Sequence, residues 1–333
     1  MVAKKMILLS SILVGMSLFS ACSNQSGDSS ISQEDKVNIG ISQIASHPAL
    51  DLAREGFIEA LNSKGFKEGE NLDLEIQNAE GDIPTSQMIS QNFISNKKDL
   101  IFAIGTPAAQ AAFNTTNDIP IIATAVTDAV QAGLVKSKDK SGTNVAGTSD
   151  AVPLEKQLKL IQEIVKDVKT IGVLYNTSEV NSEIQVNELK ELAKKNNIEV
   201  IAKGISSVND ISQSLDSILD DIDVLYTPAD NLIASSMAII ANKAIENKVP
   251  IMGAEEAHVK GGALITEGIN YKKLGFEAGL MAIEVLEGKD ISELSIKTLE
   301  ETELVINEDT LKSLSIDIDE EIMSRAKLVK GGE

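Results

Sequence analysis

From residue 36 onward, short runs of β-branched and other apolar residues alternate with longer segments in which apolar residues recur at helical spacing. This alternation predicts an α/β fold built on parallel sheets. In the first half the predicted order is strand 37–44, helix 48–63, strand 72–76, helix 85–96, strand 100–104, helix 107–115 and strand 119–125. In the second half it is strand 170–175, helix 182–197, strand 199–203, helix 208–219, strand 224–226, helix 231–247 and strand 250–252.

The two halves repeat one another in small signatures. Gly105-Thr106-Pro107-Ala108 corresponds to Tyr226-Thr227-Pro228-Ala229, and Ile119-Pro120-Ile121 corresponds to Val249-Pro250-Ile251. The repeat predicts two similar, doubly wound parallel-sheet lobes rather than one large sheet. A further strand 263–266, helix 272–286 and strand 303–306 are predicted to complete both lobes.

The segment after residue 263 predicts a hinge between the lobes. Its helix is expected to return to the first lobe, and its last strand to the second. We expect lobe 1 to comprise residues 36–148 and 271–295, and lobe 2 to comprise residues 149–270 and 296–333. The crossings are expected near residues 145–150, 268–271 and 290–297. Several short crossings between two lobes are typical of a clamp that closes on a ligand.

The first residues read as a targeting segment. Lys4 and Lys5 precede an apolar run that is too short to span a bilayer, and small residues lead to Cys22, the one cysteine of the chain. The segment resembles a bacterial lipoprotein lipobox, which implies a signal peptide over residues 1–21 and lipid attachment at Cys22. A polar tether over residues 22–35 would then hold the protein at the extracytoplasmic face of the membrane. An ordinary secretory signal with a coincidental cysteine is the alternative.

Composition narrows the function classes. The 333 residues include 43% hydrophobic residues, enough for a sizeable core, and 50 acidic against 30 basic residues give a net charge of −20. An acidic surface without Trp disfavours nucleic-acid binding. A single cysteine excludes a disulfide framework and a cysteine zinc site, and two histidines, His47 and His258, disfavour a histidine-rich metal centre. We expect no metal and no cofactor.

Candidate chemistry lies in the loops between each strand and the next helix, where parallel sheets bind ligands. These loops are rich in hydroxyl, amide and carboxylate side chains, a pattern that helix capping alone also produces. Convergence of both lobes on one cleft would suit a zwitterion, and Tyr175, Tyr226 and Tyr271 could wall its apolar or aromatic side chain. Glu255 and Glu256 are expected in solvent or at the cleft rim.

An enzyme is not expected. The chain has no Gly-x-Ser-x-Gly elbow, no Walker-type loop and no Gly-x-Gly-x-x-Gly after the first strand. Ser46, His47 and Asp51 are too close in sequence for triad geometry.

Several motifs in order carry a resemblance to a family. They are Ser46-His47-Pro48-Ala49-Leu50-Asp51, Glu80-Gly81-Asp82, Gly105-Thr106-Pro107-Ala108-Ala109-Gln110, Thr127-Asp128, residues 144–150, Ser178-Glu179-Val180-Asn181-Ser182, Pro228-Ala229-Asp230-Asn231 and Gly261-Gly262-Ala263-Leu264. With them, residues 37–306 resemble the ABC-transporter substrate-binding lipoproteins of the tryptophan/tyrosine type, which have the type I periplasmic-binding-protein fold. Relatives usually have Pro where this chain has Ala129, and often a second tyrosine where it has Lys272.

The resemblance implies a site, a ligand and partners. The ligand would be an aromatic amino acid, and a monomeric clamp would deliver it to ABC permease subunits. Thr106, Ser178 and Ser182 are expected to hold the ligand carboxylate, and Asp230 or Asp128 its amine. The implied ligand contacts are Ser46, His47, Thr106, Pro107, Asp128, Asp150, Thr177, Ser178, Asn181, Ser182, Asp230 and Asn231.

Other interpretations stay open. The same clamp could be a ligand-sensing module that presents its closed form to a membrane sensor kinase, and the ligand could be a non-aromatic amino acid or a short peptide. A transcriptional repressor with the same two-lobe architecture is excluded by the export signal and the acidic chain.

Overall fold

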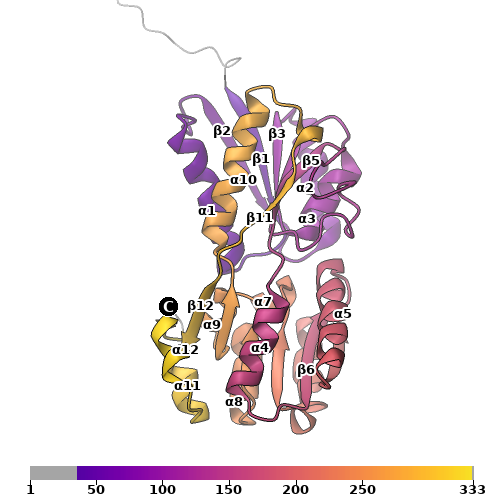
Figure 1. Cartoon of the computed structure of the whole chain (residues 1–333). Coiled ribbons are helices and arrows are strands. Elements are labelled where there is room, and N and C mark those ends of the chain that lie inside the picture. The colour runs from indigo at the N-terminus through magenta and orange to yellow at the C-terminus, as the bar shows by residue number, and fades with distance from the viewer. Residues whose placement is uncertain (1–35, 332–333) are drawn as a thin grey trace, which may run out of the picture. The chain divides into compact units, whose positions relative to one another are not determined.

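Two sheets with helices on both faces organise residues 36–331, the part of the chain that this computed structural model describes (Figure 1). The predicted signal peptide, Cys22 and the tether lie outside the described residues. No helix within residues 36–331 combines the length and apolar character needed to cross a membrane. The two similar α/β lobes predicted from the repeat are confirmed.

The first sheet has six parallel strands in the order β11-β5-β4-β3-β1-β2. Every residue of β3, β4 and β5 is buried, as expected for parallel strands covered on both faces. The strands are β1 (Val37–Gln43), β2 (Leu72–Asn78), β3 (Leu100–Ile104), β4 (Ile121–Thr124), β5 (Val145–Ser149) and β11 (Ile296–Thr298). The helical segments are α1 (Pro48–Ser63), α2 (Ile83–Ser95), α3 (Thr106–Thr115), α10 (Tyr271–Leu286) and η4 (Ile291–Glu293).

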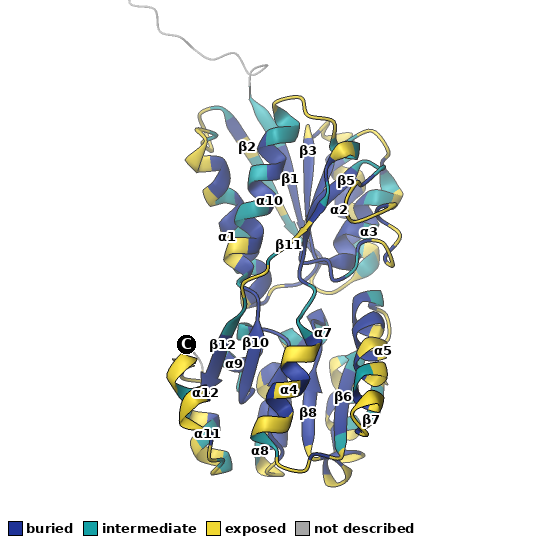
Figure 2. Ribbon diagram, viewed as in Figure 1, coloured by how far each residue is buried: buried dark blue, intermediate teal, exposed yellow. Residues whose placement is uncertain are grey.

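The second sheet has seven strands in the order β13-β12-β10-β9-β8-β6-β7, and only the β10–β12 pair is antiparallel. Its strands are β6 (Thr170–Asn176), β7 (Glu199–Ile205), β8 (Val224–Thr227), β9 (Ile251–Gly253), β10 (Ile265–Gly268), β12 (Glu303–Asn307) and β13 (Lys327–Val329). The α-helices are α4 (Leu154–Ile164), α5 (Val180–Lys195), α6 (Ile211–Asp216), α7 (Asn231–Ser235), α8 (Met237–Glu246), α9 (Glu256–Lys260), α11 (Glu308–Leu314) and α12 (Glu320–Arg325). Figure 2 shows the buried strands inside both lobes.

Two predicted helices are interrupted. The segment 208–219 contains the short η2 (Val208–Asp210), then α6, and then η3 (Leu219–Asp221) begins. The segment 231–247 divides at Ser236 into α7 and α8. The pattern assigned no element to β5, α4 or the chain after β12, although Leu158 and Ile161 of α4 bury in the second lobe's core.

Three short crossings join the lobes, after β5, after β10 and after β11. The first two agree with the predicted positions. The third needs a correction, because β11 pairs with β5 in the first sheet, from Ile296 opposite Gly147 to Thr298 opposite Ser149. Lobe 1 therefore extends through Thr298, and the crossing occupies residues 299–302.

Helices α1 and α10 pack backbone against backbone on the first sheet. A Cβ atom added to Gly275 would lie 1.8 Å from the carbonyl oxygen of Ala53, and one added to Gly56 would lie 2.0 Å from that of Lys272. Beneath α1, the rings of Phe57 and Phe102 stack with their centroids 3.7 Å apart. This close packing fixes the α10 N-terminus, which begins directly after the second crossing.

We predict that Gly275→Ala destabilises the protein by about 3 kcal/mol, because a methyl group cannot enter the contact without moving one helix. Urea unfolding followed by circular dichroism measures the loss. Gly331→Ala is the control, because its added Cβ would meet its nearest atom at an ordinary 3.8 Å. Equal stability of Gly275→Ala and wild type would contradict the packing.

Candidate ligand-binding site

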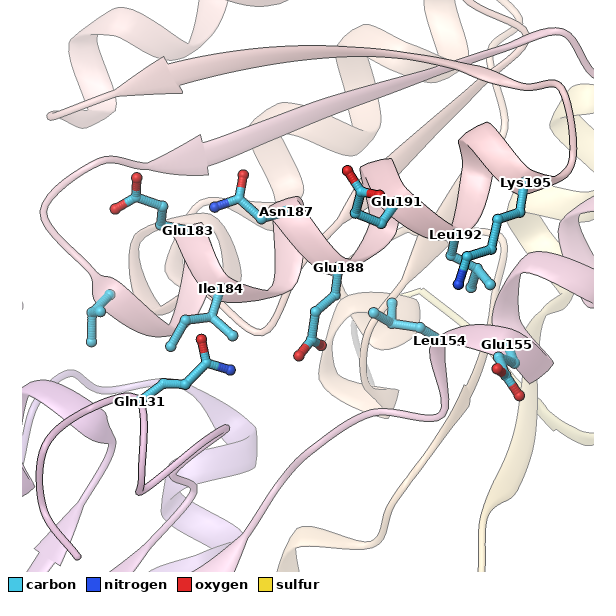
Figure 3. A pocket seen from close by; sticks show the side chains of 11 residues that line it. Gln131, Leu154, Glu155, Glu183, Ile184, Asn187, Glu188, Glu191, Leu192 and Lys195 are labelled. Atoms are coloured by element: carbon cyan, nitrogen blue, oxygen red, sulfur yellow. The ribbon is translucent and has the colours of Figure 1, made fainter. Parts of the chain in front are cut away.

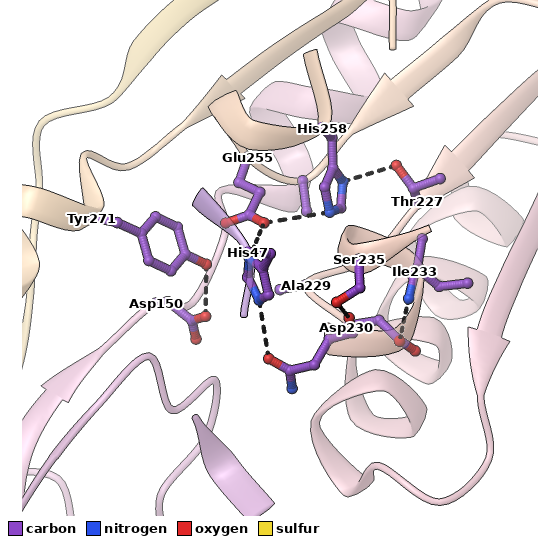
Figure 4. Close-up of polar contacts among 12 residues, drawn as sticks. His47, Asp150, Thr227, Ala229, Asp230, Ile233, Ser235, Glu255, His258 and Tyr271 are labelled. Atoms are coloured by element: carbon purple, nitrogen blue, oxygen red, sulfur yellow. Dashed lines mark hydrogen bonds and ion pairs between the residues drawn. The ribbon is translucent and has the colours of Figure 1, made fainter. Parts of the chain in front are cut away.

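The lobes meet around a small cavity (Figure 4). Its volume of about 10 Å³ leaves room for a single water molecule at most. Any larger ligand therefore requires the lobes to separate and to close again around it. The lining consists of His47, Leu50 and Ala125 from the first lobe, Asn181, Ala229, Asp230, Asn231 and Glu255 from the second, and Asp150 and Tyr271 beside the crossings.

The polar lining comes from residues that precede helices. His47, Asp230 and Glu255 are the N-cap residues of α1, α7 and α9, and all three have extended backbone conformations. Asp230 caps its helix by accepting a hydrogen bond from the Ile233 N–H. The side chains of His47 and Glu255 form no capping hydrogen bond. Capping therefore explains Asp230 but leaves His47 and Glu255 without a local structural role.

Glu255 lies between two imidazoles. Its Oε1 atom is 3.4 Å from Nε2 of His258 and 3.9 Å from Nδ1 of His47. All three side chains are buried, and they come from both lobes. Figure 4 shows the imidazole rings of His47 and His258 directed at the carboxyl group of Glu255.

Hydrogen-bond partners assign the tautomer of each histidine. Asn231 donates its amide N–H to Glu179, so its Oδ1 faces Nε2 of His47 as an acceptor and that nitrogen carries the proton. Thr227 donates its hydroxyl proton to the Met252 carbonyl, so the Nδ1–H of His258 donates to the Thr227 hydroxyl. In the neutral rings, the nitrogens that face Glu255 are therefore lone-pair acceptors.

The hydroxyl of Tyr271 brings a second carboxyl group into the cluster. It donates to Oδ2 of Asp150 at 2.8 Å and also lies within hydrogen-bonding reach of Glu255. Thr127 donates to the other oxygen of Asp150 at 3.1 Å. Because a phenol has one proton, Tyr271 cannot satisfy both carboxyl groups.

The pKa values follow from this arrangement. Burial, followed by the charge of Asp150, raises the pKa of Glu255 to about 8. Burial also raises the pKa of Asp150 despite its two donors. Burial lowers the pKa of His47, and burial together with repulsion between the two rings when both are protonated lowers that of His258 to about 3, so both imidazoles are neutral at pH 7.

The cavity consequently offers hydrogen-bond acceptors and no cation. Neither Lys nor Arg lines it, and Nδ1 of His47, Oδ1 of Asn181 and Oε2 of Glu255 are buried without a hydrogen-bond partner among the described residues. Each such atom costs about 1–3 kcal/mol. Within residues 36–331, no group of three or more His, Cys, Asp and Glu side chains is arranged to hold a metal ion. An organic ammonium group fits these acceptors.

A second polar network serves the second lobe itself. Asp230 accepts from the Asn176 N–H at 2.6 Å and from the Ser182 hydroxyl at 2.7 Å, in addition to its cap. Glu179 accepts from the side-chain amides of Asn181 and Asn231. These bonds hold the N-termini of α5 and α7 together. Asp230 therefore accepts hydrogen bonds from three groups of the second lobe, and the hydroxyl proton of Ser182 is already used in one of them.

The sequence-predicted residues divide into four groups. His47, Asp150, Asn181, Asp230 and Asn231 line the cavity. Thr106, Pro107 and Ser182 are buried but outside the lining, and Ser46, Thr177 and Ser178 are exposed. Asp128 is half-buried outside the lining, where it accepts from the backbone N–H groups of Val130 and Gln131 and pairs with Lys138 at 3.3 Å.

Two expectations for other residues were wrong. Glu255 is 2% exposed and lies inside the cluster, whereas a solvated or rim position was expected. Of the three tyrosines, only Tyr271 lines the cavity. Tyr226 is a core residue whose hydroxyl donates to Gln157 at 2.8 Å, and Tyr175 lies outside the lining. The position of Glu255 between β9 and α9 was the available signal for its role.

Comparisons with known proteins match most of the chain to proteins that bind small ligands. The family described as ABC transporter substrate binding protein matches residues 38–330. A tyrosine-binding protein of Clostridioides difficile (strain R20291) is 53% identical over 310 residues, covering 91% of this chain and 90% of the relative.

Two solved structures differ in how well they superpose. The structure of an ABC domain in complex with L-Trp from Streptococcus pneumonia is 34% identical, covers 88% of this chain and 99% of its own, and has a TM-score of 0.85. The ligand-free, open structure of a substrate-binding protein with adhesive properties from Clostridium difficile is 51% identical and covers 89% and 99%, yet its TM-score is 0.69. The arrangement of the lobes here thus matches the complex better than the more similar open protein.

We predict that the protein without ligand loses stability as the pH rises from 7 to 8. In this range His47 and His258 bind few protons even in the unfolded chain, so the raised pKa of Glu255 dominates. Glu255 binds its proton more tightly in the folded state, where its pKa is about 8, than in the unfolded chain. Its stabilising contribution is therefore complete below the unfolded pKa and is lost as the pH rises through the folded pKa, at about 1 kcal/mol per pH unit. Urea unfolding at several pH values measures this slope.

Glu255→Gln should make the slope shallower, and a residual slope of the same sign should remain because burial also raises the pKa of Asp150 and, together with the charge of Glu179, raises that of Asp230 to about 7. Glu256→Gln is the matched control, since Glu256 is half-buried, pairs with Lys260 and Lys327 and has a lowered pKa despite partial burial. An unchanged slope in Glu255→Gln would show that Glu255 is ionised at neutral pH.

Proposed function

Because the chain belongs to the family of ABC transporter substrate-binding proteins, we propose that it binds an aromatic amino acid, tyrosine or tryptophan, between its lobes and delivers it to a transporter for import. The main support is the 53% identity to a tyrosine-binding protein over 91% of the chain. The L-Trp complex with a TM-score of 0.85 supports the same class of ligand.

We assign the ammonium group of the ligand to Glu255 and Asp150. It carries three N–H donors and a positive charge, and these carboxyl groups with Nδ1 of His47 are acceptors that lack a matching cation in the cavity. This assignment replaces Asp230 and Asp128, which were expected to hold the amine. Asp230 already accepts hydrogen bonds from three donors. Asp128 accepts from a backbone N–H of its own turn and pairs with Lys138.

The ligand carboxylate needs donors without an arginine. We propose Thr106 and the free N–H groups at the start of α3, a helix of ten residues. The Thr106 hydroxyl is buried without a partner among the described residues, and an added Cβ at the neighbouring Gly105 would lie 3.8 Å from Oδ1 of Asn231 in the second lobe. We no longer assign Ser182 and Ser178 to the ligand carboxylate. The Ser182 hydroxyl donates to Asp230, and Ser178 is exposed.

Closure of the lobes is part of this proposal. An ammonium group held by Glu255 and Asp150 touches the second lobe and the first crossing, and His47 adds the first lobe. A ligand that contacts both lobes shifts the population toward the closed arrangement by its differential affinity for that state. Leu50, Ala125, Ala229 and Tyr271 supply the apolar part of the lining for the aromatic ring.

We predict that Glu255→Gln weakens L-tyrosine binding at least thirtyfold, or about 2 kcal/mol, because a charged acceptor is lost. Titration calorimetry of the purified protein measures the affinity, with Glu256→Gln as the control. The analogue 3-(4-hydroxyphenyl)lactate, which has a hydroxyl in place of the ammonium group, should bind wild type weakly and lose little more in Glu255→Gln.

Two outcomes would contradict this account in different ways. Equal affinity of wild type and Glu255→Gln for L-tyrosine would remove the ammonium assignment. Heat released by a sugar or a nucleoside, with none from any of the twenty amino acids, would overturn the class of ligand.

We also propose that Cys22 carries a lipid that holds the protein on the extracytoplasmic face of the membrane. The support is the sequence alone: Lys4 and Lys5, an apolar run, and small residues before the one cysteine, followed by a polar segment. A polar tether of 14 residues, from 22 to 35, gives the lobes freedom to reach a transporter in the same membrane.

Cys22→Ser should release the protein from the membrane fraction, because the thiol that receives the lipid is gone. Fractionation of expressing cells followed by immunoblotting measures the distribution. Ser23→Ala is the control and should stay with the membrane. Retention of Cys22→Ser in the membrane fraction would contradict lipid attachment at this residue.

A further inference from the structure

A groove of about 570 Å³ runs along α5 in the second lobe, away from the candidate site (Figure 3). Its apolar lining consists of Leu154 at the start of α4, and Val180, Ile184 and Leu192 on α5. Gln131 from the first lobe lies at one end, opposite Ile184 and Glu188 in Figure 3. The groove thus combines an apolar strip with contributions from both lobes.

The polar rim of this groove is strongly acidic. It carries one lysine, Lys195, and four glutamates, Glu155, Glu183, Glu188 and Glu191. None of these five side chains forms an ion pair or a hydrogen bond with another described residue. Glu188 and Glu191, three residues apart on one helix, repel each other mildly.

Several glutamates elsewhere on the surface do have a lysine partner. Glu277 lies 3.3 Å from Lys297, Glu284 lies 2.6 Å from Lys289, and Glu59 lies 2.8 Å from Lys272. What marks the groove is that four carboxylates without a cationic partner among the described residues gather beside one apolar strip. Such a surface complements a segment whose apolar side chains are flanked by Lys or Arg.

We propose that this groove binds a basic, amphipathic segment of the transporter's membrane-embedded subunit. Apolar side chains of that segment fill the strip, and its cations pair with Glu183, Glu188 and Glu191. A second copy of this chain fits poorly because each copy has a net charge of −20. The chain's own tether fits poorly as well, since its charged residues are Asp28, Glu34 and Asp35.

Closure of the lobes completes the groove. Gln131 belongs to a first-lobe turn held by Asp128, and Val180 packs against the hydrophobic core of the first lobe. Opening would carry Gln131 away from α5 and expose Val180. The partner segment therefore binds the closed arrangement more tightly than the open one.

The test compares two variants of the full chain with the same change in charge, E183K/E188K/E191K in the groove and E68K/E246K/E287K elsewhere. The three control glutamates are exposed, and none of them forms an ion pair with a described residue. The probe is a fluorescent helical peptide of leucine and lysine, and fluorescence anisotropy measures its binding at low and high salt. E183Q/E188Q/E191Q removes the charges without reversal, should the lysine variant fold poorly.

We expect wild type and the control variant to bind the peptide alike, more weakly at high salt, and the groove variant to bind at least tenfold more weakly. Equal peptide affinity of the groove and control variants would overturn the groove as a binding surface. This measurement needs no amino acid, so its outcome is separate from that of the ligand titration.

Uptake of labelled L-tyrosine by cells that produce the full chain and its transporter tests the partner. This arm rests on the proposed function, whose own failure would appear in the ligand titration. We expect the groove variant to keep its affinity for L-tyrosine within twofold and to lose uptake at least tenfold, while the control variant keeps both. Normal uptake by the groove variant would overturn the transporter as the partner.

Discussion

Glu255 is buried among hydrogen-bond acceptors, and the rest of the candidate site depends on this constraint. The imidazoles of His47 and His258 present lone pairs to it, and the Tyr271 hydroxyl donates its hydrogen bond to Asp150. Burial, followed by the charge of Asp150, raises the pKa of Glu255 to about 8, so a carboxylate here requires a proton or a cation. An incoming ammonium group can replace the proton. The members of this cluster come from both lobes and from the residues beside two crossings, so the group to which we assign the ligand ammonium lies where the lobes meet.

The same constraint connects fold, closure and specificity. The packing of α1 against α10 fixes the N-terminus of α10, where Tyr271 lies, and Asp150 follows β5 at the first crossing. The cavity holds about 10 Å³ in the arrangement described, and that arrangement matches an L-Trp complex better than a ligand-free, open relative. In our proposals, the ligand and the transporter use separate surfaces. The ligand is assigned to the cavity between the lobes, and the acidic groove along α5 lies outside the lining of that cavity.

Much of the fold could be predicted from the sequence, because apolar runs and amphipathic segments alternate regularly and repeat between the halves. Helix α4 was not assigned although it is amphipathic, and β11 was placed in the wrong lobe because a three-residue strand carries too little pattern to reveal its pairing partner. Five of the twelve expected site residues line the cavity. The others could not be separated from them, because Ser, Thr and Asp before a helix look the same whether they cap it or face a ligand. The sequence does not separate Glu255 from its neighbour Glu256, which is half-buried and paired with Lys260 and Lys327.

A crystal structure of the protein with L-tyrosine tests the central claim most directly. The account predicts the ligand between the lobes, with its ammonium nitrogen within about 3.2 Å of a carboxyl oxygen of Glu255 or Asp150. An ammonium nitrogen bound instead by Asp230 or Asp128, with Glu255 and Asp150 remote from the ligand, would contradict it.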